Sequence, residues 1–290
     1  MTKFCSTIPE DGRIGGEHQT LAAVFVIKSA GFCYNFPVNK KKLIVANWKM
    51  NPGSVSEARA LFGKTKRAGG RLEKVETVIC PPFPYLGMFA RTGTARVFLG
   101  AQDVFWANSA RATGEVSPEM LKHLGVIYCI IGHSERRALG ETDDSVSKKL
   151  RAVLAERLIP IVCVGEKERD IDGRYFETLK SQILASFSGV TGAQLRGVCV
   201  AYEPLWAIGK SAKDAMEPRG IHEMAIFIHK VLFDQFGEGA ERPRILYGGS
   251  VEEKNAGSIL VEGGVSGLLV GHASLDGEGF AKMLRVANAV

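Results

Sequence analysis

The 290-residue sequence lacks several patterns that define common protein classes. Its six cysteines form no Cys-x-x-Cys pair, so no zinc site or thiol redox motif is indicated. No apolar run reaches the roughly 18 residues of a membrane helix. The apolar segment 21–27 is too short, and it follows acidic residues rather than the basic start of a signal peptide. We therefore expect no metal, no membrane span and a cytoplasmic location.

The sequence also lacks a concentrated basic region. The net charge is +6, but the Lys and Arg residues are scattered, and only 40–42 forms a run. A nucleic-acid site requires basic and aromatic side chains gathered on one face, and no such face can be identified. With 46% hydrophobic and 23% charged residues, the chain has the balance of a soluble globular protein. We expect no nucleic-acid partner.

Four of the cysteines lie inside short apolar runs, at Cys80, Cys129, Cys163 and Cys199. Cysteine in such a run behaves as a small buried hydrophobic residue. We therefore predict free, buried thiols in a reducing compartment rather than disulfides.

Short runs rich in Val, Ile, Leu and Cys recur along the chain. They are continuously apolar rather than alternating with polar residues, which is typical of parallel strands covered on both faces. The predicted strands are 43–48, 76–80, 96–102, 126–131, 160–164, 197–202, 244–248 and 267–270.

Segments of helical character separate these strands, among them 56–69, 144–158 and 221–236. Eight strand-helix units predict one closed α/β barrel over residues 41–290, with a doubly wound open sheet as the alternative. The barrel is favoured because no Gly-x-Gly-x-x-Gly follows the first strand. Residues 1–40 stand outside the pattern, and we expect them to be a mobile N-terminal extension.

Unusual polar residues follow the ends of the predicted strands. Lys49 follows the first, His133 the fourth and Glu203 the sixth, and glycine-rich turns follow the last two. Taken alone, each of these features has a simple structural explanation. Lys49 could be a surface cation, His133 a hydrogen-bonded polar residue and Glu203 an acid at the start of a helix, and the glycines could form tight turns. In a barrel they gather at one rim, where enzymes of this architecture carry their active sites.

Six segments of the sequence resemble the motifs of the triosephosphate isomerase family, in the same order and spacing, from residue 42 to the C-terminus. They are NWKMN, TGEVSPEML, GHSERR, CVGE, AYEPLWAIG and YGGSV. The resemblance implies a single (β/α)8 TIM barrel. It also implies interconversion of dihydroxyacetone phosphate and D-glyceraldehyde 3-phosphate, in glycolysis and gluconeogenesis, without metal or organic cofactor.

The resemblance further implies roles for individual residues. Glu203 would be the base that moves a proton between adjacent carbons, and His133 a neutral electrophile at a helix start, an arrangement for which this family is itself the standard example. Lys49 would supply positive charge and Asn47 a hydrogen-bond donor. The supporting and phosphate-binding residues would be Ser134, Glu135, Gly209, Ser250, Gly271 and His272.

Two mobile or shared parts are implied as well. A lid from Pro204 to about Asp214 would cover the substrate, with the proline stiffening its near hinge. A homodimer would form in which the loop carrying Thr113 and Glu115 reaches toward Asn47 and Lys49 of the partner subunit.

The chain departs from the family's pattern at three places. Residues 209–214 read GKSAKD where the family usually has a segment like GTGKTA, His272 stands where a second glycine is usual, and Asp103 stands where Asn is more common. None removes a catalytic group. Two alternatives stay open: an isomerase of a tetrulose phosphate, which the altered lid favours, and a non-enzymatic phosphate-binding barrel, which predicts loss of the rim residues.

Overall fold

The computed structural model describes residues 41–209, 215–238 and 240–290. The predicted extension at 1–40 and the far half of the predicted lid, 210–214, lie outside these residues. These described residues belong to one compact unit.

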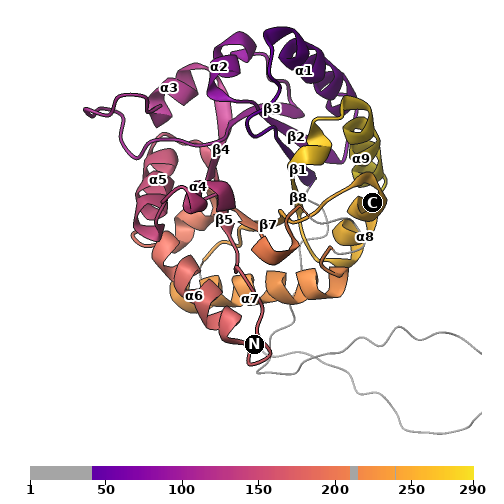
Figure 1. The fold of residues 1–290 in the computed structure, drawn as a ribbon. Helices are drawn as coiled ribbons and strands as arrows, with labels where there is room; N and C mark the ends of the chain where they lie inside the picture. The colour runs from indigo at the N-terminus through magenta and orange to yellow at the C-terminus, as the bar shows by residue number, and fades with distance from the viewer. Residues whose placement is uncertain (1–40, 210–214, 239) are drawn as a thin grey trace, which may run out of the picture. The chain divides into compact units, whose positions relative to one another are not determined.

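Parallel strands pair in sequence order, and the last pairs with the first, so the described residues form a closed eight-stranded barrel (Figure 1). The strands are β1 (Lys42–Asn47), β2 (Val75–Cys80), β3 (Val97–Ala101), β4 (Val126–Ile131), β5 (Ile159–Val164), β6 (Cys199–Tyr202), β7 (Arg244–Tyr247) and β8 (Gly267–Val270). The predicted barrel is confirmed, and the open-sheet alternative is wrong.

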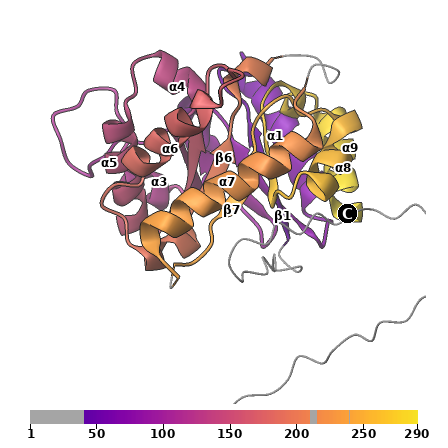
Figure 2. The ribbon, with the colours of Figure 1, turned by 90° about the horizontal axis from the view of Figure 1, so that it is seen from below.

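Helices surround the barrel, and Figures 1 and 2 show them outside the strands. The α-helices are α1 (Val55–Gly69), α2 (Phe83–Leu86), α3 (Pro118–His123), α4 (Ser134–Ala138), α5 (Asp143–Ala155), α6 (Arg174–Ser186), α7 (Pro218–Phe236), α8 (Glu253–Glu262) and α9 (Gly277–Ala289). Short 3-10 turns are η1 (Gly87–Phe89), η2 (Gly192–Gly197), η3 (Leu205–Ala207) and η4 (His272–Ser274).

Two apolar clusters hold the barrel together. Successive side chains of a strand point to opposite faces, so Ile44 and Ala46 of β1 belong to the layer between strands and helices. Leu43 and Val45 belong instead to the cluster that fills the barrel interior. The strands are apolar without alternation because side chains on both of their faces are buried. For this reason the continuous apolar runs of the sequence located each strand end within two residues.

The four cysteines of the described strands are free and buried, as predicted. Burial raises the pKa of the Cys199 thiol to about 12. Within the segments 41–209, 215–238 and 240–290, no helix has the length and apolar character needed to cross a membrane.

Candidate active site

A cavity of about 390 Å³ opens where the strands end and the following loops begin. Eight of the residues singled out from the sequence line it together: Asn47, Lys49, His133, Glu203, Gly209, Ser250, Gly271 and His272. Ser134 and Glu135 lie directly behind, each bonded to one of the lining side chains. The barrel thus brings residues from its first strand and from the loop after its last strand into one site.

His133 is the N-terminal cap of α4, one residue beyond Gly132, whose φ of 69° lets the chain turn out of β4. Its Nδ1 accepts a hydrogen bond from the backbone N–H of Glu135, at 3.2 Å. Because Nδ1 accepts, the ring proton lies on Nε2. Nε2 faces Glu203 Oε1 at 3.2 Å, so the imidazole presents an N–H donor to the centre of the site.

Glu203 leaves β6 directly into Pro204, and its side chain is only 3% exposed. Its backbone N–H binds the carbonyl of Val164 on the neighbouring strand at 2.8 Å. The carboxylate holds two donors, His133 Nε2 and the backbone N–H of Ser134, the latter at 3.0 Å to Oε2. A buried charge requires such partners, and the first turn of α4 supplies both.

Two glycines make room for Glu203, a role for which no separate signal was visible in the sequence. A Cβ on Gly165 would lie 1.8 Å from the Glu203 carbonyl oxygen, and one on Gly248 would lie 2.9 Å from Glu203 Cγ. Any side chain at either position would therefore displace the carboxylate. These positions require glycine for space, since neither has a positive φ.

Lys49 is held in an uncommon backbone conformation, with φ at 53°. Its N–H binds Asn47 Oδ1 at 3.0 Å, which leaves the Asn47 amide NH2 as the donor toward the cavity. Lys49 Nζ binds Glu135 Oε1 at 2.6 Å. Glu135 thus orients both the lysine, through its carboxylate, and His133, through its backbone.

The far end of the cavity is built from the loops after β7 and β8. Ser250 Oγ donates to the carbonyl of Ala207 at 2.9 Å, which ties the β7 loop to η3 of the lid segment. Gly271 lies against Lys49, whose Cε is 3.1 Å from where a Cβ on Gly271 would stand. The backbone N–H groups of these loops lie at the starts of α8 and η4, the type of place where barrels bind phosphate.

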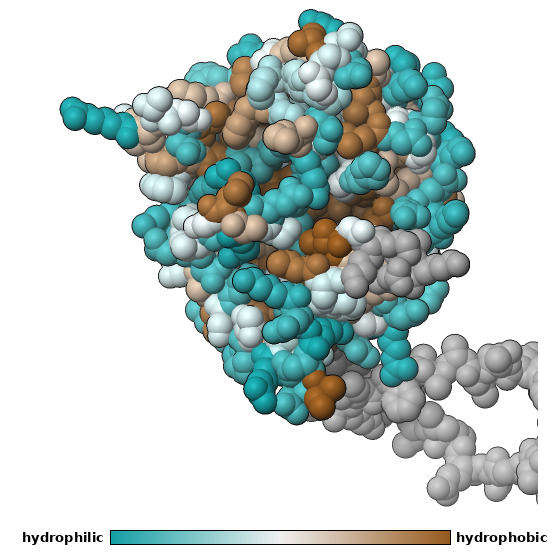
Figure 3. Space-filling model, viewed as in Figure 1, coloured by the Kyte–Doolittle hydropathy of each residue, from teal (hydrophilic) through white to brown (hydrophobic). Residues whose placement is uncertain are grey.

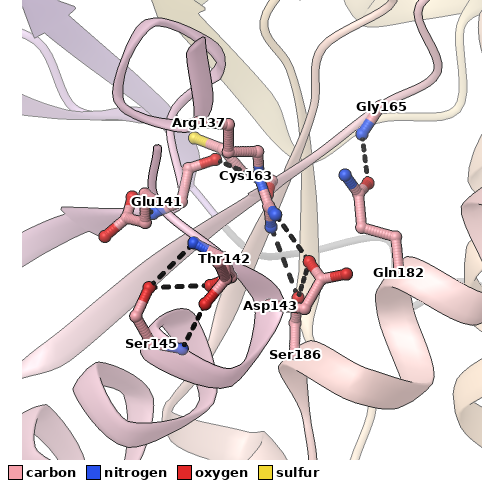
Figure 4. Close-up of polar contacts among 10 residues, drawn as sticks. Arg137, Glu141, Thr142, Asp143, Ser145, Cys163, Gly165, Gln182 and Ser186 are labelled. Atoms are coloured by element: carbon pink, nitrogen blue, oxygen red, sulfur yellow. Dashed lines mark hydrogen bonds and ion pairs between the residues drawn. The ribbon is translucent and has the colours of Figure 1, made fainter. Parts of the chain in front are cut away.

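Arg137 anchors the loop that carries His133, a role that sequence reasoning missed. Its Nε donates to the carbonyl of Gly132 at 2.7 Å, and its guanidinium reaches Asp143 at 2.5 Å and both the Cys163 carbonyl and Ser186 Oγ at 3.3 Å (Figure 4). One planar cation thereby joins β4, α5, β5 and α6. The motif GHSERR contained this arginine, but its partners come from distant segments.

A second missed group lies under the lid hinge. Glu166 is 1% exposed, and its Oε1 accepts hydrogen bonds from Tyr202 Oη and Trp206 Nε1, both at 2.8 Å, and from Arg169 Nε at 3.1 Å. The Arg169 guanidinium also lies over the rings of Tyr175 and Trp206. Burial, and then the charge of Glu166, raises the pKa of Tyr202. The hydroxyl therefore stays a donor to the carboxylate.

Two remaining predictions concern the edge of the site. Asp103 is buried, and its carboxylate, a charge that an Asn would not carry, binds Lys149 at 2.6 Å and Arg136 at 2.9 Å. Lys149 also pairs with Glu141, so the two cations are shared among these carboxylates. Thr113 and Glu115 do not line the cavity. They are exposed on the loop between β3 and α3, which projects from the barrel (Figure 1).

Comparison with known proteins agrees with this geometry. The family model described as triosephosphate isomerase matches residues 42–287. A triosephosphate isomerase of Moorella thermoacetica is 41% identical over 253 residues, which cover 84% of this chain and 98% of the relative. One of Citrifermentans bemidjiense is 42% identical over 251 residues, covering 85% and 98%. One of Alkaliphilus metalliredigens is 39% identical over 246 residues, covering 83% and 97%.

Proposed function

The chain belongs to the triosephosphate isomerase family, and from this premise we propose which of its residues interconvert dihydroxyacetone phosphate and D-glyceraldehyde 3-phosphate. The observation that carries the proposal is the pair formed by His133 and Glu203. A buried carboxylate faces an imidazole N–H at 3.2 Å in a cavity that also holds Lys49. Barrel residues 41–290 form the catalytic domain of this proposal.

The reaction moves a proton between adjacent carbons through an enediolate. Glu203 takes the proton from the carbon, because it is the buried carboxylate at the centre of the cavity. The substrate oxygen accepts from His133 Nε2, so it competes with Glu203 for that donor. On binding, Glu203 therefore gives up one of its two hydrogen-bond partners to the substrate, which leaves Oε1 free to face the carbon that loses the proton.

His133 donates to the oxygen as negative charge develops and passes a proton between the two oxygens. Its Nδ1 stays fixed by the Glu135 N–H, which keeps the proton on Nε2. Lys49 and the Asn47 amide stabilise the same charge, and the Lys49 ammonium exchanges Glu135 for the substrate when it binds.

The phosphate binds at the far end of the cavity. Backbone N–H groups of Ser250, Gly271 and His272 receive it, and Gly209 adds another when the lid closes over the substrate. The hydrogen bond from Ser250 to Ala207 links the loop after β7, which binds the phosphate, to η3 at the start of the lid. Phosphate binding and lid position are therefore coupled.

We also propose a homodimer located in the cytoplasm. A groove of about 340 Å³ beside Lys49 and His133 is lined by Met50, Phe83 and Leu139. Met50 is 93% and Leu139 80% exposed. Hydrophobic atoms are visible among hydrophilic ones on this face of the molecule (Figure 3). The projecting loop that carries Thr113 and Glu115, supplied by a second copy, would cover these side chains.

The experiment is a coupled assay on D-glyceraldehyde 3-phosphate, with a four-carbon ketose phosphate run alongside. We expect rapid turnover of the triose, and a Glu203→Asp protein whose kcat falls by orders of magnitude with little change in KM. The shortened variant keeps the charge but withdraws it by about one methylene. Near-normal turnover of this variant would remove Glu203 as the base, and stronger turnover of the longer sugar would favour the tetrulose phosphate isomerase.

A further inference from the structure

Two ionisable side chains at the phosphate end of the cavity have no part in the proton transfer. His272 begins η4, and Glu252 stands directly before α8; both line the cavity. The Glu252 carboxylate accepts the backbone N–H of Asn255, and the Glu252 N–H binds Asn255 Oδ1 at 2.8 Å. Glu252 is therefore fixed in place by its own helix.

The charge of the cavity does not suit a doubly negative ligand when His272 is neutral. Among the described lining residues, Glu203 and Glu252 are acidic and Lys49 is the basic residue besides the two histidines. Lys49 is itself paired with Glu135 at 2.6 Å. The two negative charges of Glu203 and Glu252 therefore have no free cation among these residues, and they oppose a phosphate dianion.

The geometry of the β8 loop places His272 where it can correct this balance. Ser274 donates to the carbonyl of Gly271 twice, from its N–H at 2.9 Å and its Oγ at 2.7 Å, which fixes the turn. Lys49 lies against Gly271 on the inner side. His272 is exposed, so its imidazole has room to turn toward a ligand held by the loop.

We propose that the His272 imidazole is a phosphate-binding side chain of this chain: protonated, it donates a charge-assisted hydrogen bond to a phosphate oxygen and offsets Glu252. The inference rests on the proposed function for the position of the phosphate. It adds a side-chain contact to a site built otherwise from backbone N–H groups.

The contact makes anion affinity depend on pH. Histidine is the side chain whose charge changes between about pH 5 and 8. The other charged or titratable residues that line the cavity with His272 are Glu252 before α8, Lys49 after β1, Glu203 after β6 and His133 after β4. A dianion favours the protonated imidazole, so its binding tightens as pH falls.

The test uses sulfate, which stays doubly negative over this range. Binding is measured by calorimetry at pH 5.5 and pH 8 for the unaltered protein, His272→Gly and Glu252→Gln. We expect His272→Gly to bind sulfate roughly three- to tenfold more weakly at pH 5.5 and to differ little at pH 8. Glu252→Gln keeps an oxygen that can cap α8, and it should bind sulfate more tightly than the unaltered protein at both pH values. Equal affinities of His272→Gly and the unaltered protein at pH 5.5 would overturn the proposal.

Kinetics separate this contact from a structural role. At pH 6, His272→Gly should raise KM for glyceraldehyde 3-phosphate by about the same factor as it raises the dissociation constant for sulfate at that pH. Its kcat should stay within about twofold of that of the unaltered protein. A fall in kcat at unchanged KM would contradict a phosphate contact. If the unaltered protein bound sulfate through His272 yet did not isomerise the triose, the proposed function would fail and this inference would stand.

Discussion

Gly165 shows how strictly one residue sets the position of the proposed base. A Cβ there would lie 1.8 Å from the carbonyl oxygen of Glu203, far inside contact distance. We expect Gly165→Ala to push the β6 end aside and to lower kcat for triose isomerisation by at least about a hundredfold, since misplacement of a catalytic group by about 1 Å has such an effect. Steady-state kinetics measure it.

Gly87 is the matched control for this substitution. Among the described residues, no atom lies within 4 Å of the place that a Cβ on Gly87 would take, and its φ is −59°. Gly87→Ala should leave kcat and the melting temperature unchanged. A fully active Gly165→Ala protein would show that the β6 end tolerates the shift and that Glu203 does not need its observed place.

At the scale of elements, α4 depends on Arg137 to hold the His133 loop against its neighbours. Lysine at this position keeps the charge but cannot reach Gly132, Asp143 and Cys163 together, because it lacks the planar fork. We expect Arg137→Lys to lose about 1–3 kcal/mol of unfolding free energy and to lower kcat roughly tenfold. Urea unfolding and kinetics check the two effects.

Arg174→Lys provides the comparison, because Arg174 is 80% exposed and pairs with Asp172 at the surface. It should behave like the unaltered protein. If Arg137→Lys also left the free energy of unfolding and kcat unchanged, the loop carrying His133 would be held by its backbone turn alone.

Helix α7 carries an acid-sensitive residue. Burial, and then the charge of Arg242, lowers the pKa of His229 to about 4 from 6.5. As pH falls, His229 of the unfolded state therefore binds a proton at a higher pH than His229 of the folded state. The free energy of unfolding is highest above about pH 6.5 and falls by at most about 3 kcal/mol as the pH drops toward 4.

The measurement is urea unfolding as a function of pH for the unaltered protein and His229→Gln. In His229→Gln, the free energy of unfolding should decline less between pH 6.5 and 4 than in the unaltered protein. The control is His123→Gln, at an exposed position of α3, which should decline as the unaltered protein does. Identical pH profiles for all three proteins would place the acid sensitivity elsewhere.

The sequence predicted elements better than contacts. Apolar runs found the strands because both faces of each strand are buried, and the motifs located Lys49, His133 and Glu203 because rim residues follow strand ends. The partners of Arg137 and the clearance around Gly165 were not predictable, since each involves residues of other strands that meet only after the barrel closes.

At the scale of the whole molecule, the apolar groove beside Lys49 leads to a prediction about assembly. Met50 and Leu139 are exposed in a single chain and would be covered in a dimer. We expect the purified protein to have the mass of two chains by light scattering, and Met50→Asp to yield single chains with strongly reduced kcat. Val261→Asp, at an exposed position on α8 away from the groove, serves as control. Single chains with full activity would contradict the proposed dimer.

The central claim is that Glu203 carries the proton between the two carbons of the triose. The most direct test is isomerisation of dihydroxyacetone phosphate in D2O, with the product trapped and its deuterium content read by NMR. Because the protonated Glu203 carboxyl group can exchange its proton with solvent before returning it, we predict deuterium at the C2 carbon of the product. Glu203→Gln should lose both the deuterium incorporation and the turnover. Rapid formation of product by Glu203→Gln, with deuterium at that carbon, would contradict the account.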